Sequence, residues 1–169
     1  MLSFRRLTCA VLSAATLAAC DAPVADPEQG PIFTTVLTAS NASGEQPAEF
    51  ASGEPITFKA VVTNHTSKTQ PVVWCSGLTN VAIVVRTSDG EWVWHQYDGM
   101  GFIQAEQEDS FGPHETRTTR VVWRQDYDNQ KADTGPPVPP GHYYAVAEGC
   151  ASDPYGEGFD SEPVDFLIQ

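Results

Sequence analysis

The four cysteines of the chain are the residues with the widest choice of chemistry. Cys9 and Cys20 lie within the first twenty residues, whereas Cys75 and Cys150 are widely separated in the remainder. A cysteine can form a disulfide, ligate a metal ion or be modified at its thiol. No C-x-x-C pair occurs, and no histidine stands at ligand spacing from Cys75 or Cys150, so we expect no metal site at these thiols.

The N-terminal segment has the layout of an export signal. Arg5 and Arg6 are followed by an uncharged, largely apolar run, residues 7–19, that ends in small side chains. This run is too short to cross a bilayer as a helix, because a helical span takes about 20 apolar residues. We therefore interpret residues 1–19 as a signal peptide.

The end of this segment, Leu17-Ala18-Ala19-Cys20, resembles the lipobox of bacterial lipoproteins. The resemblance implies that the Cys20 thiol receives a diacylglyceryl group and that this lipid attaches the protein to a membrane. Residues 20–31 combine prolines with acids and are expected to form a flexible tether. Asp21 resembles the enterobacterial signal for inner-membrane retention. We therefore expect a lipid-anchored protein of the cell envelope, with the periplasmic face of the inner membrane favoured over the outer membrane.

Cys75 and Cys150 are then the cysteines that remain in the folded part, because Cys9 is removed with the signal and Cys20 is lipidated. In an oxidising compartment the simplest outcome is a disulfide between them. A bridge that closes a loop of about 75 residues contributes about 4 kcal/mol in the chain-entropy model.

The chain is strongly acidic, with 22 acidic and 9 basic residues and a formal net charge of -13. Two of the basic residues lie in the signal peptide, so the remainder is more acidic still. Such a chain is repelled by nucleic acid and by anionic lipid head groups. We expect no nucleic-acid partner, and we expect membrane attachment to depend on the lipid.

From residue 32 onward the sequence predicts short strands separated by turns. The clearest strand is 55–64, in which Ile56, Phe58, Ala60 and Val62 alternate with the residues of the opposite face. Ser88-Asp89-Gly90-Glu91 predicts a tight primed hairpin turn between strands at 81–87 and 92–97. Because no stretch of ten or more residues has a helical period, residues 32–169 are expected to form an all-β sandwich of about seven to nine strands. The other expected strands are 32–39, 71–75, 115–125, 142–149 and 163–169.

Aromatic residues after the predicted turn offer one candidate binding surface. Strand alternation would place Trp92 and Trp94 on one face, with Tyr97 nearby, where they could bind a sugar or a peptide. Alternatively these side chains build the sandwich core, with Trp92 the one most expected to be exposed. Met100 marks the tip of a glycine-flanked loop, whose flexibility argues against a rigid inhibitory loop.

The proline-rich stretch TGPPVPPGH at 134–142 is a second candidate. Pro137 and Pro139 could belong to a stiff segment that is presented to a protease cleft or an aromatic groove, because stiffness lowers the entropy lost on binding. Alternatively the stretch is a connector in which Pro140 and Gly141 turn the chain into the next strand.

The sequence favours no catalytic residue and no cofactor. The four histidines His65, His95, His114 and His142 lie apart, without an H-E-x-x-H or G-x-S-x-G motif, so we do not expect an enzyme. Acids on a glycine-rich loop could bind calcium without a fixed spacing rule, although a solvated acidic loop is the preferred interpretation and no metal ligand is assigned. These acids are Asp153, Glu157, Asp160 and Glu162.

Four motifs in order resemble the BsuPI domain, which takes its name from the intracellular proteinase inhibitor of Bacillus. They are ITFKAVVTNHT, DGEWVWHQYDGMGFIQA, FGPHET and PPGHYYAVA, and the resemblance covers about residues 50–150. Tyr97-Asp98 replaces the family's aromatic-serine pair, and Pro113-His114-Glu115 replaces its Pro-Gly-Glu turn. The resemblance implies an immunoglobulin-like antiparallel β-sandwich and inhibition of a proteinase.

The sequence therefore leads to an envelope-anchored lipoprotein that works as a binding module. Its expected partner is a protein, and the resemblance suggests a protease. The alternatives are a module that binds a glycan or calcium, and a scaffold lipoprotein without a small ligand.

Overall fold

The computed structural model describes residues 30–75, 80–97, 106–127, 136–150 and 159–169. Over these residues the protein is all-β, with ten strands and no helix that could cross a membrane. The strands are β1 (Phe33–Ser40), β2 (Glu49–Phe50), β3 (Ile56–Asn64), β4 (Gln70–Trp74), β5 (Ala82–Thr87), β6 (Trp92–His95), β7 (Gln107–Phe111), β8 (Thr116–Trp123), β9 (Gly141–Glu148) and β10 (Val164–Ile168).

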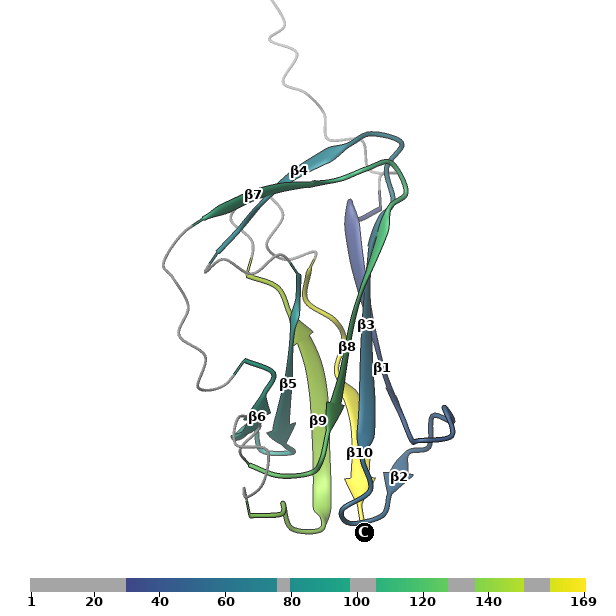
Figure 1. Cartoon of the computed structure of the whole chain (residues 1–169), viewed down its shortest axis with the longest axis vertical. Helices are drawn as coiled ribbons and strands as arrows, with labels where there is room; N and C mark the ends of the chain where they lie inside the picture. The colour runs from purple at the N-terminus through teal and green to yellow at the C-terminus, as the bar shows by residue number, and fades with distance from the viewer. Residues whose placement is uncertain (1–29, 76–79, 98–105, 128–135, 151–158) are drawn as a thin grey trace, which may run out of the picture.

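Two sheets form the body of the sandwich. One has the strand order β1-β3-β8, and the other has the order β2-β10-β9-β5-β6. Their pairings are antiparallel except that of β2 with β10, which is parallel. A separate two-stranded ribbon, β4-β7, lies across one end of the body, and β10 and the C-terminus lie toward the other (Figure 1). The expected antiparallel β-sandwich is thus confirmed.

All eight strands expected from the sequence are present, and two others are added. In β3, Ile56, Phe58, Ala60 and Val62 are fully buried, as the alternation predicts. Strand β2 has only two residues, which is too short for any periodicity to show. Strand β7, QEDSF, is rich in residues that are depleted in strands, and it extends because it pairs along its whole length with β4.

The hairpin between β5 and β6 is present, but its turn is not the expected primed type. Of the turn residues only Gly90 has a positive φ, at 91°, and Asp89 does not. The Gly90 N–H donates to the Thr87 carbonyl, and the Thr87 N–H donates to the Glu91 carbonyl, both at 2.9 Å. This is the three-residue loop in which an ordinary turn is followed by a left-handed glycine.

Aromatic side chains fill the core in two clusters. The sandwich cluster lies between the two sheets, where neighbouring rings are 5.8 to 6.5 Å apart. It comprises Phe50, Phe58, Trp94, Trp123, Tyr143 and Phe166. The ribbon cluster lies where the β4-β7 ribbon meets β1, with the Phe33 and Phe159 rings 4.7 Å apart. It comprises Phe33, Trp74, Phe111 and Phe159. Rings of this size bury large apolar areas, so the two clusters supply much of the cohesion of the fold.

A disulfide between Cys75 and Cys150 joins the end of β4 to the end of β9, as the sequence predicts. Their Cα atoms are 5.4 Å apart, and the Cys75 N–H donates to the Cys150 carbonyl at 2.9 Å. The Cα separation is ordinary for a disulfide. Since the bridge closes a long loop, it constrains the unfolded chain strongly.

The ribbon is also held by an ion-pair group on its surface. Arg117 in β8 pairs with Asp109 and Glu115, and its guanidinium lies 4.1 Å from the ring centre of Phe111. Burial raises the pKa of the Asp109 carboxyl, but hydrogen bonds from Arg117, from the Ser110 backbone N–H and from the Trp74 indole outweigh this and lower it below its ordinary value. The ribbon is therefore tied to the body by charge as well as by packing.

Asn64, at the end of β3, is a buried hub at this same end of the sandwich. Its side chain is fully buried. The amide nitrogen lies 3.0, 3.4 and 2.7 Å from the carbonyl oxygens of Lys68, Phe111 and Gly112. The amide oxygen accepts from the backbone N–H and the hydroxyl of Thr66, both at 2.9 Å. One side chain thus joins the β3–β4 loop to the turn between β7 and β8.

We predict that Asn64→Ala lowers the free energy of unfolding by about 2 to 4 kcal/mol, because buried carbonyls lose their donor. Asn64→Asp should be similarly damaging, since a carboxylate cannot donate to those carbonyls. Chemical denaturation measures both changes. Asn41→Ala is the control, because the Asn41 side chain bonds only at the solvent-exposed surface. Equal losses for the Asn41 and Asn64 alanine variants would contradict the role of Asn64.

Candidate functional site

The proline segment, residues 136–140, crosses the end of the sandwich opposite the ribbon and leads into β9 (Figure 1). Its central residue, Val138, is only 2% exposed and belongs to the hydrophobic core. The four prolines on either side are exposed, including Pro137 and Pro139, which the sequence singles out. The segment is thus held to the core by its central residue, and the prolines on both sides are exposed to solvent.

Three hydrogen bonds fix the backbone of the proline segment. The Val138 N–H donates to the Gln125 carbonyl at 2.9 Å, and the Tyr127 N–H donates to the Pro136 carbonyl at 3.3 Å. The Tyr143 hydroxyl donates to the Pro139 carbonyl at 2.6 Å. Prolines have a fixed φ, so with these bonds the segment has little conformational freedom left to lose.

Gln125, whose carbonyl accepts the hydrogen bond from Val138, has an unusual backbone conformation. Its side chain is 1% exposed, and its φ of 61° places it in the left-handed region. The side-chain oxygen accepts from the Gly53 N–H at 2.7 Å, and the amide nitrogen donates to the carbonyls of Ala51 and Glu54. A left-handed conformation is unfavourable for glutamine and persists only where the surroundings enforce it. Gln125 therefore locks the turn at 51–54 and the proline segment to one another.

This geometry suits a stiff recognition surface. Pro137, Pro139 and the 40% exposed Tyr127 project from a backbone that is already held in one conformation. The segment also acts as the connector into β9 that the sequence offers as the alternative. The two roles are compatible, because a short, taut connector is what keeps the segment rigid. Binding through Pro137 and Pro139 stays a prediction.

The prediction that Trp92 and Trp94 lie on the same face of their strand is wrong. Val85 pairs with Trp94, whereas the next residue, Arg86, pairs with Trp92, so the register shifts by one residue and β6 has a bulge. An extra residue reverses the alternation of side chains beyond it. Trp94 consequently enters the core at 2% exposure, and Trp92 stays 58% exposed.

Trp92 instead shares the outer face of the five-stranded sheet with polar neighbours. The Arg86 guanidinium lies 4.6 Å from the centre of the indole ring, and the His95 ring centre lies 5.6 Å away. Arg86 in turn pairs with Glu148 at 2.8 Å. Tyr97 packs against His95 with ring centres 6.1 Å apart. Burial raises the pKa of the Tyr97 hydroxyl. A cation stacked on the indole orients it, so the exposed part of Trp92 has a defined direction.

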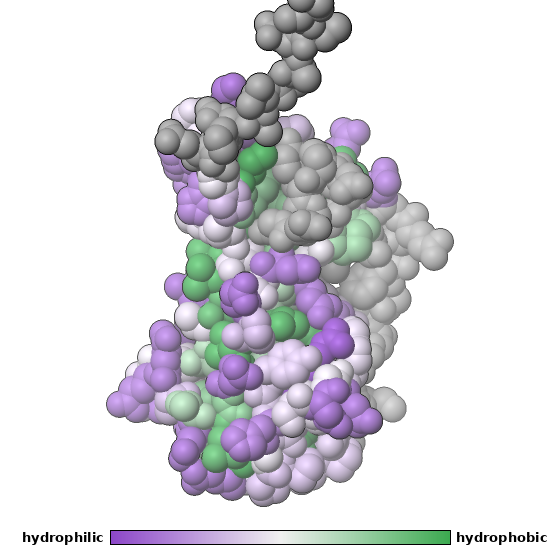
Figure 2. All heavy atoms as spheres, turned by 180° about the vertical axis from the view of Figure 1, so that it is seen from behind, coloured by the Kyte–Doolittle hydropathy of each residue, from purple (hydrophilic) through white to green (hydrophobic). Residues whose placement is uncertain are grey.

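The described surface is mixed rather than uniformly apolar. On the face shown from behind in Figure 2, hydrophobic residues occur in small groups that are separated by hydrophilic ones. Among the described residues the exposed large hydrophobic side chains are Ile32, Val36, Trp92, Val122 and Tyr127. Recognition at this surface would therefore use individual exposed side chains, not one broad apolar patch.

Several sequence candidates fall outside the described residues. These are Cys20, Met100, and the acids Asp153 and Glu157. Of the other two acids considered as calcium ligands, Asp160 accepts a hydrogen bond from the Gly149 N–H at 2.9 Å. Across the described ranges there is no group of three or more histidine, cysteine or acidic side chains that could hold a metal ion.

Two residues central to the site escaped sequence reasoning. Val138 lies between two pairs of prolines. A single apolar residue between prolines could have been used to predict that this side chain is buried and holds the segment to the core. Gln125 gave no such signal, because a glutamine with positive φ is recognisable only from its backbone.

Several solved structures are remotely similar to this chain. The C-terminal domain of Wzt has 10% identity and a TM-score of 0.47, with 85% of this chain and 80% of that one covered. The CARDB domain of PF1109 from Pyrococcus furiosus has 11% identity and a TM-score of 0.44, with coverages of 82% and 90%. The DNA glycosylase AlkC from Pseudomonas fluorescens has 13% identity and a TM-score of 0.44, with coverages of 83% and 31%. The chain thus spans less than a third of AlkC.

No curated protein matches the sequence. The sequence profile of one family does, over residues 45–153, and it is described as BsuPI, intracellular proteinase inhibitor. This range contains all four motifs on which the resemblance rests, together with the proline segment and Trp92. It covers well over half of the chain. The family is one of inhibitors rather than enzymes, and this chain belongs to it: it is a member of the BsuPI intracellular proteinase inhibitor family.

Proposed function

We propose that this protein is an envelope-anchored proteinase inhibitor that places its proline segment, residues 136–140, in the cleft of a protease. Family membership supports inhibition as the activity. The observation that carries the choice of segment is the buried Val138 anchor beneath exposed Pro137 and Pro139. A loop that is rigid before binding loses little entropy in the complex, which favours tight association.

The position of the segment supports its availability to a partner. Pro31 lies at the ribbon end, because the His65 N–H in the β3–β4 loop bonds to the adjacent Ile32 carbonyl. Gln125 and the proline segment lie beyond the other end of β3, where Ile56 pairs with Trp123. Nine residues of β3 separate these ends, which is roughly 30 Å for an extended strand. A tether that enters at the ribbon end would leave the proline segment pointing away from a membrane.

We expect the full-length chain, purified in detergent, to inhibit at least one member of a panel of serine proteases at micromolar concentration or below. The double substitution Pro137→Gly with Pro139→Gly should weaken that inhibition about tenfold or more, because the segment regains backbone freedom. Steady-state hydrolysis of peptide substrates measures both effects.

The matched control is Pro71→Gly, which makes the same change at an exposed proline of β4, in the ribbon. It should leave the inhibition constant unchanged. An absence of inhibition across the panel would overturn the proposed function. Inhibition that is equally strong in the double variant would exclude the proline segment as the contact surface.

The membrane anchor is the second part of the proposal. It is supported by the export-signal pattern before Cys20 and by the lipobox resemblance of residues 17–20. An acidic domain would not bind an anionic bilayer by charge, so its attachment depends on the lipid.

Cys20→Ser should abolish metabolic labelling with palmitate and move the protein from the membrane fraction to the soluble fraction. Cys9→Ser, a change within the signal itself, should leave labelling intact. Membrane attachment of the Cys20 variant would refute lipid anchoring at this position.

Trp92 favours a second candidate function, binding of a glycan. Its indole is 58% exposed and is oriented by the stacked Arg86 guanidinium, which is a suitable arrangement for contact with a sugar face. This surface lies on the outer face of the five-stranded sheet, whereas the proline segment lies at its end, so the two candidates can be tested separately.

If Trp92 binds cell-wall oligosaccharides, titration with them should change the tryptophan fluorescence saturably, and Trp92→Ala should remove the response. The fold should survive this substitution, because the Trp92 side chain is mostly exposed. Tyr127→Ala, at another exposed aromatic residue, is the control. A flat titration of the unchanged protein would eliminate this candidate.

A further inference from the structure

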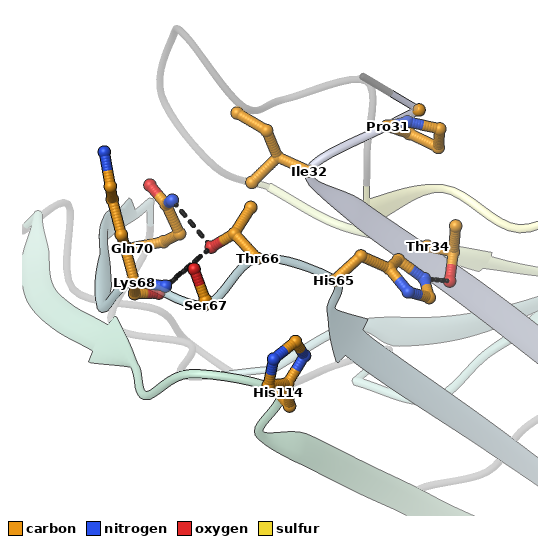
Figure 3. A pocket seen from close by; sticks show the side chains of 10 residues that line it. Pro31, Ile32, Thr34, His65, Thr66, Ser67, Lys68, Gln70 and His114 are labelled. Atoms are coloured by element: carbon orange, nitrogen blue, oxygen red, sulfur yellow. Dashed lines mark hydrogen bonds between the residues drawn. The ribbon is translucent and has the colours of Figure 1, made fainter. Parts of the chain in front are cut away.

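A pocket of about 730 Å³ lies at the ribbon end, far from the proline segment. It is bounded by the start of β1, by the β3–β4 loop and by the turn between β7 and β8. In Figure 3, Pro31 and Ile32 lie on one side of it and His114 lies on the other, with Thr66 and Lys68 toward one flank and His65 toward the opposite flank. The volume falls within the range of small-molecule sites.

The charged and titratable side chains of the pocket are all basic. Lys68, His65 and His114 line it, and none of its ten described lining residues is acidic. This is unusual in a chain with 22 acidic residues and a net charge of -13. The acids of the adjoining turn and strand, Glu115 and Asp109, are both paired with Arg117. The lining residues of the pocket therefore carry positive charge in a chain whose net charge is negative.

His114 occupies its place in the pocket at a cost in backbone energy. Its φ is 55°, in the left-handed region that glycine adopts most readily. Non-glycine residues in this conformation concentrate at functional sites. The histidine thus replaces the residue that the turn itself would favour, and it adds an imidazole to the pocket wall.

The frame around these groups is already ordered. The His114 N–H donates to the Thr66 carbonyl at 3.1 Å, and Asn64 binds both Thr66 and Gly112. The His65 Nε2 lies 2.7 Å from the Thr34 hydroxyl, which fixes the orientation of that ring. The backbone frame and the His65 ring are therefore in place before any ligand arrives.

We propose that this pocket binds a soluble small molecule through an oxyanion group, either phosphate or carboxylate. The flexible Lys68 side chain, which lies at one flank, turns toward His114 so that both contact the oxyanion, with His65 on the opposite flank. Pro31 and Ile32 contact an apolar part of the ligand. Cationic donors that converge on an oxyanion form stronger hydrogen bonds than neutral donors. This site is separate from the proposed protease contact.

The four histidines of the chain provide a direct test, because two line the pocket and two do not. Imidazole resonances of the full-length chain in detergent are followed by NMR at fixed pH during titration with inorganic phosphate, acetate or benzoate. We expect saturable shifts for His65 and His114 and none for His95 and His142. Benzoate should bind several-fold tighter than acetate, because its ring can contact Ile32.

Three variants separate the site from general charge effects and from folding. Lys68→Gln should weaken binding of the preferred probe about tenfold, which corresponds to loss of one charge-assisted contact. Lys59→Gln removes the same charge from an exposed position in β3 and should have no effect. His114→Gly should also weaken binding, while its thermal stability should be unchanged or higher, because glycine accepts the local φ.

Two results would overturn the proposal. One is that none of the three probes shifts His65 and His114 saturably. The other is that Lys59→Gln weakens binding as much as Lys68→Gln, since the effect would then reflect net charge and not this pocket.

Discussion

The fully buried Asn64 side chain is the interaction on which one whole end of this protein depends. Its amide reaches the β3–β4 loop and the turn between β7 and β8, and it therefore fixes where the ribbon begins and where it ends. An amide can do this because it donates and accepts at once, whereas a buried carboxylate or an apolar side chain would leave backbone carbonyls unpaired. The ribbon cluster and the Cys75–Cys150 disulfide complete the attachment.

The opposite end of the sandwich is also held together by a buried side-chain amide. There Gln125 is the buried amide, and it binds the turn at 51–54 through its side chain and Val138 through its carbonyl. A residue with positive φ occurs at each of these ends. At the Asn64 end it is His114, whose N–H bonds to the Thr66 carbonyl, and at the other end it is Gln125 itself. Strain of this kind can persist because the surrounding sheets are rigid. Both candidate sites are consequently irregular segments supported by a stiff scaffold, the usual arrangement for binding loops.

Because the chain belongs to an inhibitor family, its surfaces can be compared with what an inhibitor requires. An inhibitor needs a surface that keeps its shape when a protease binds it, and the proline segment has such a surface because its freedom is removed by prolines, by hydrogen bonds and by a core anchor. The Trp92 surface and the basic pocket lie elsewhere on the fold. A small sandwich can present separate surfaces because its sheets need only one face each for the core.

The sequence by itself determined eight of the ten described strands, the all-β class, the pairing of Cys75 with Cys150 and the family. These depend on local alternation, turn residues and cysteine number, all of which are legible along the chain. It did not reveal β7, which is extended through its pairing with β4, or the bulge that separates Trp92 from Trp94. Only the tertiary structure decided that Val138 is an anchor, that Gln125 and Asn64 are hubs, and that Lys68 and His114 share a pocket. Those features arise from contacts between segments distant in sequence, and a one-residue bulge or a left-handed backbone leaves no periodic signal.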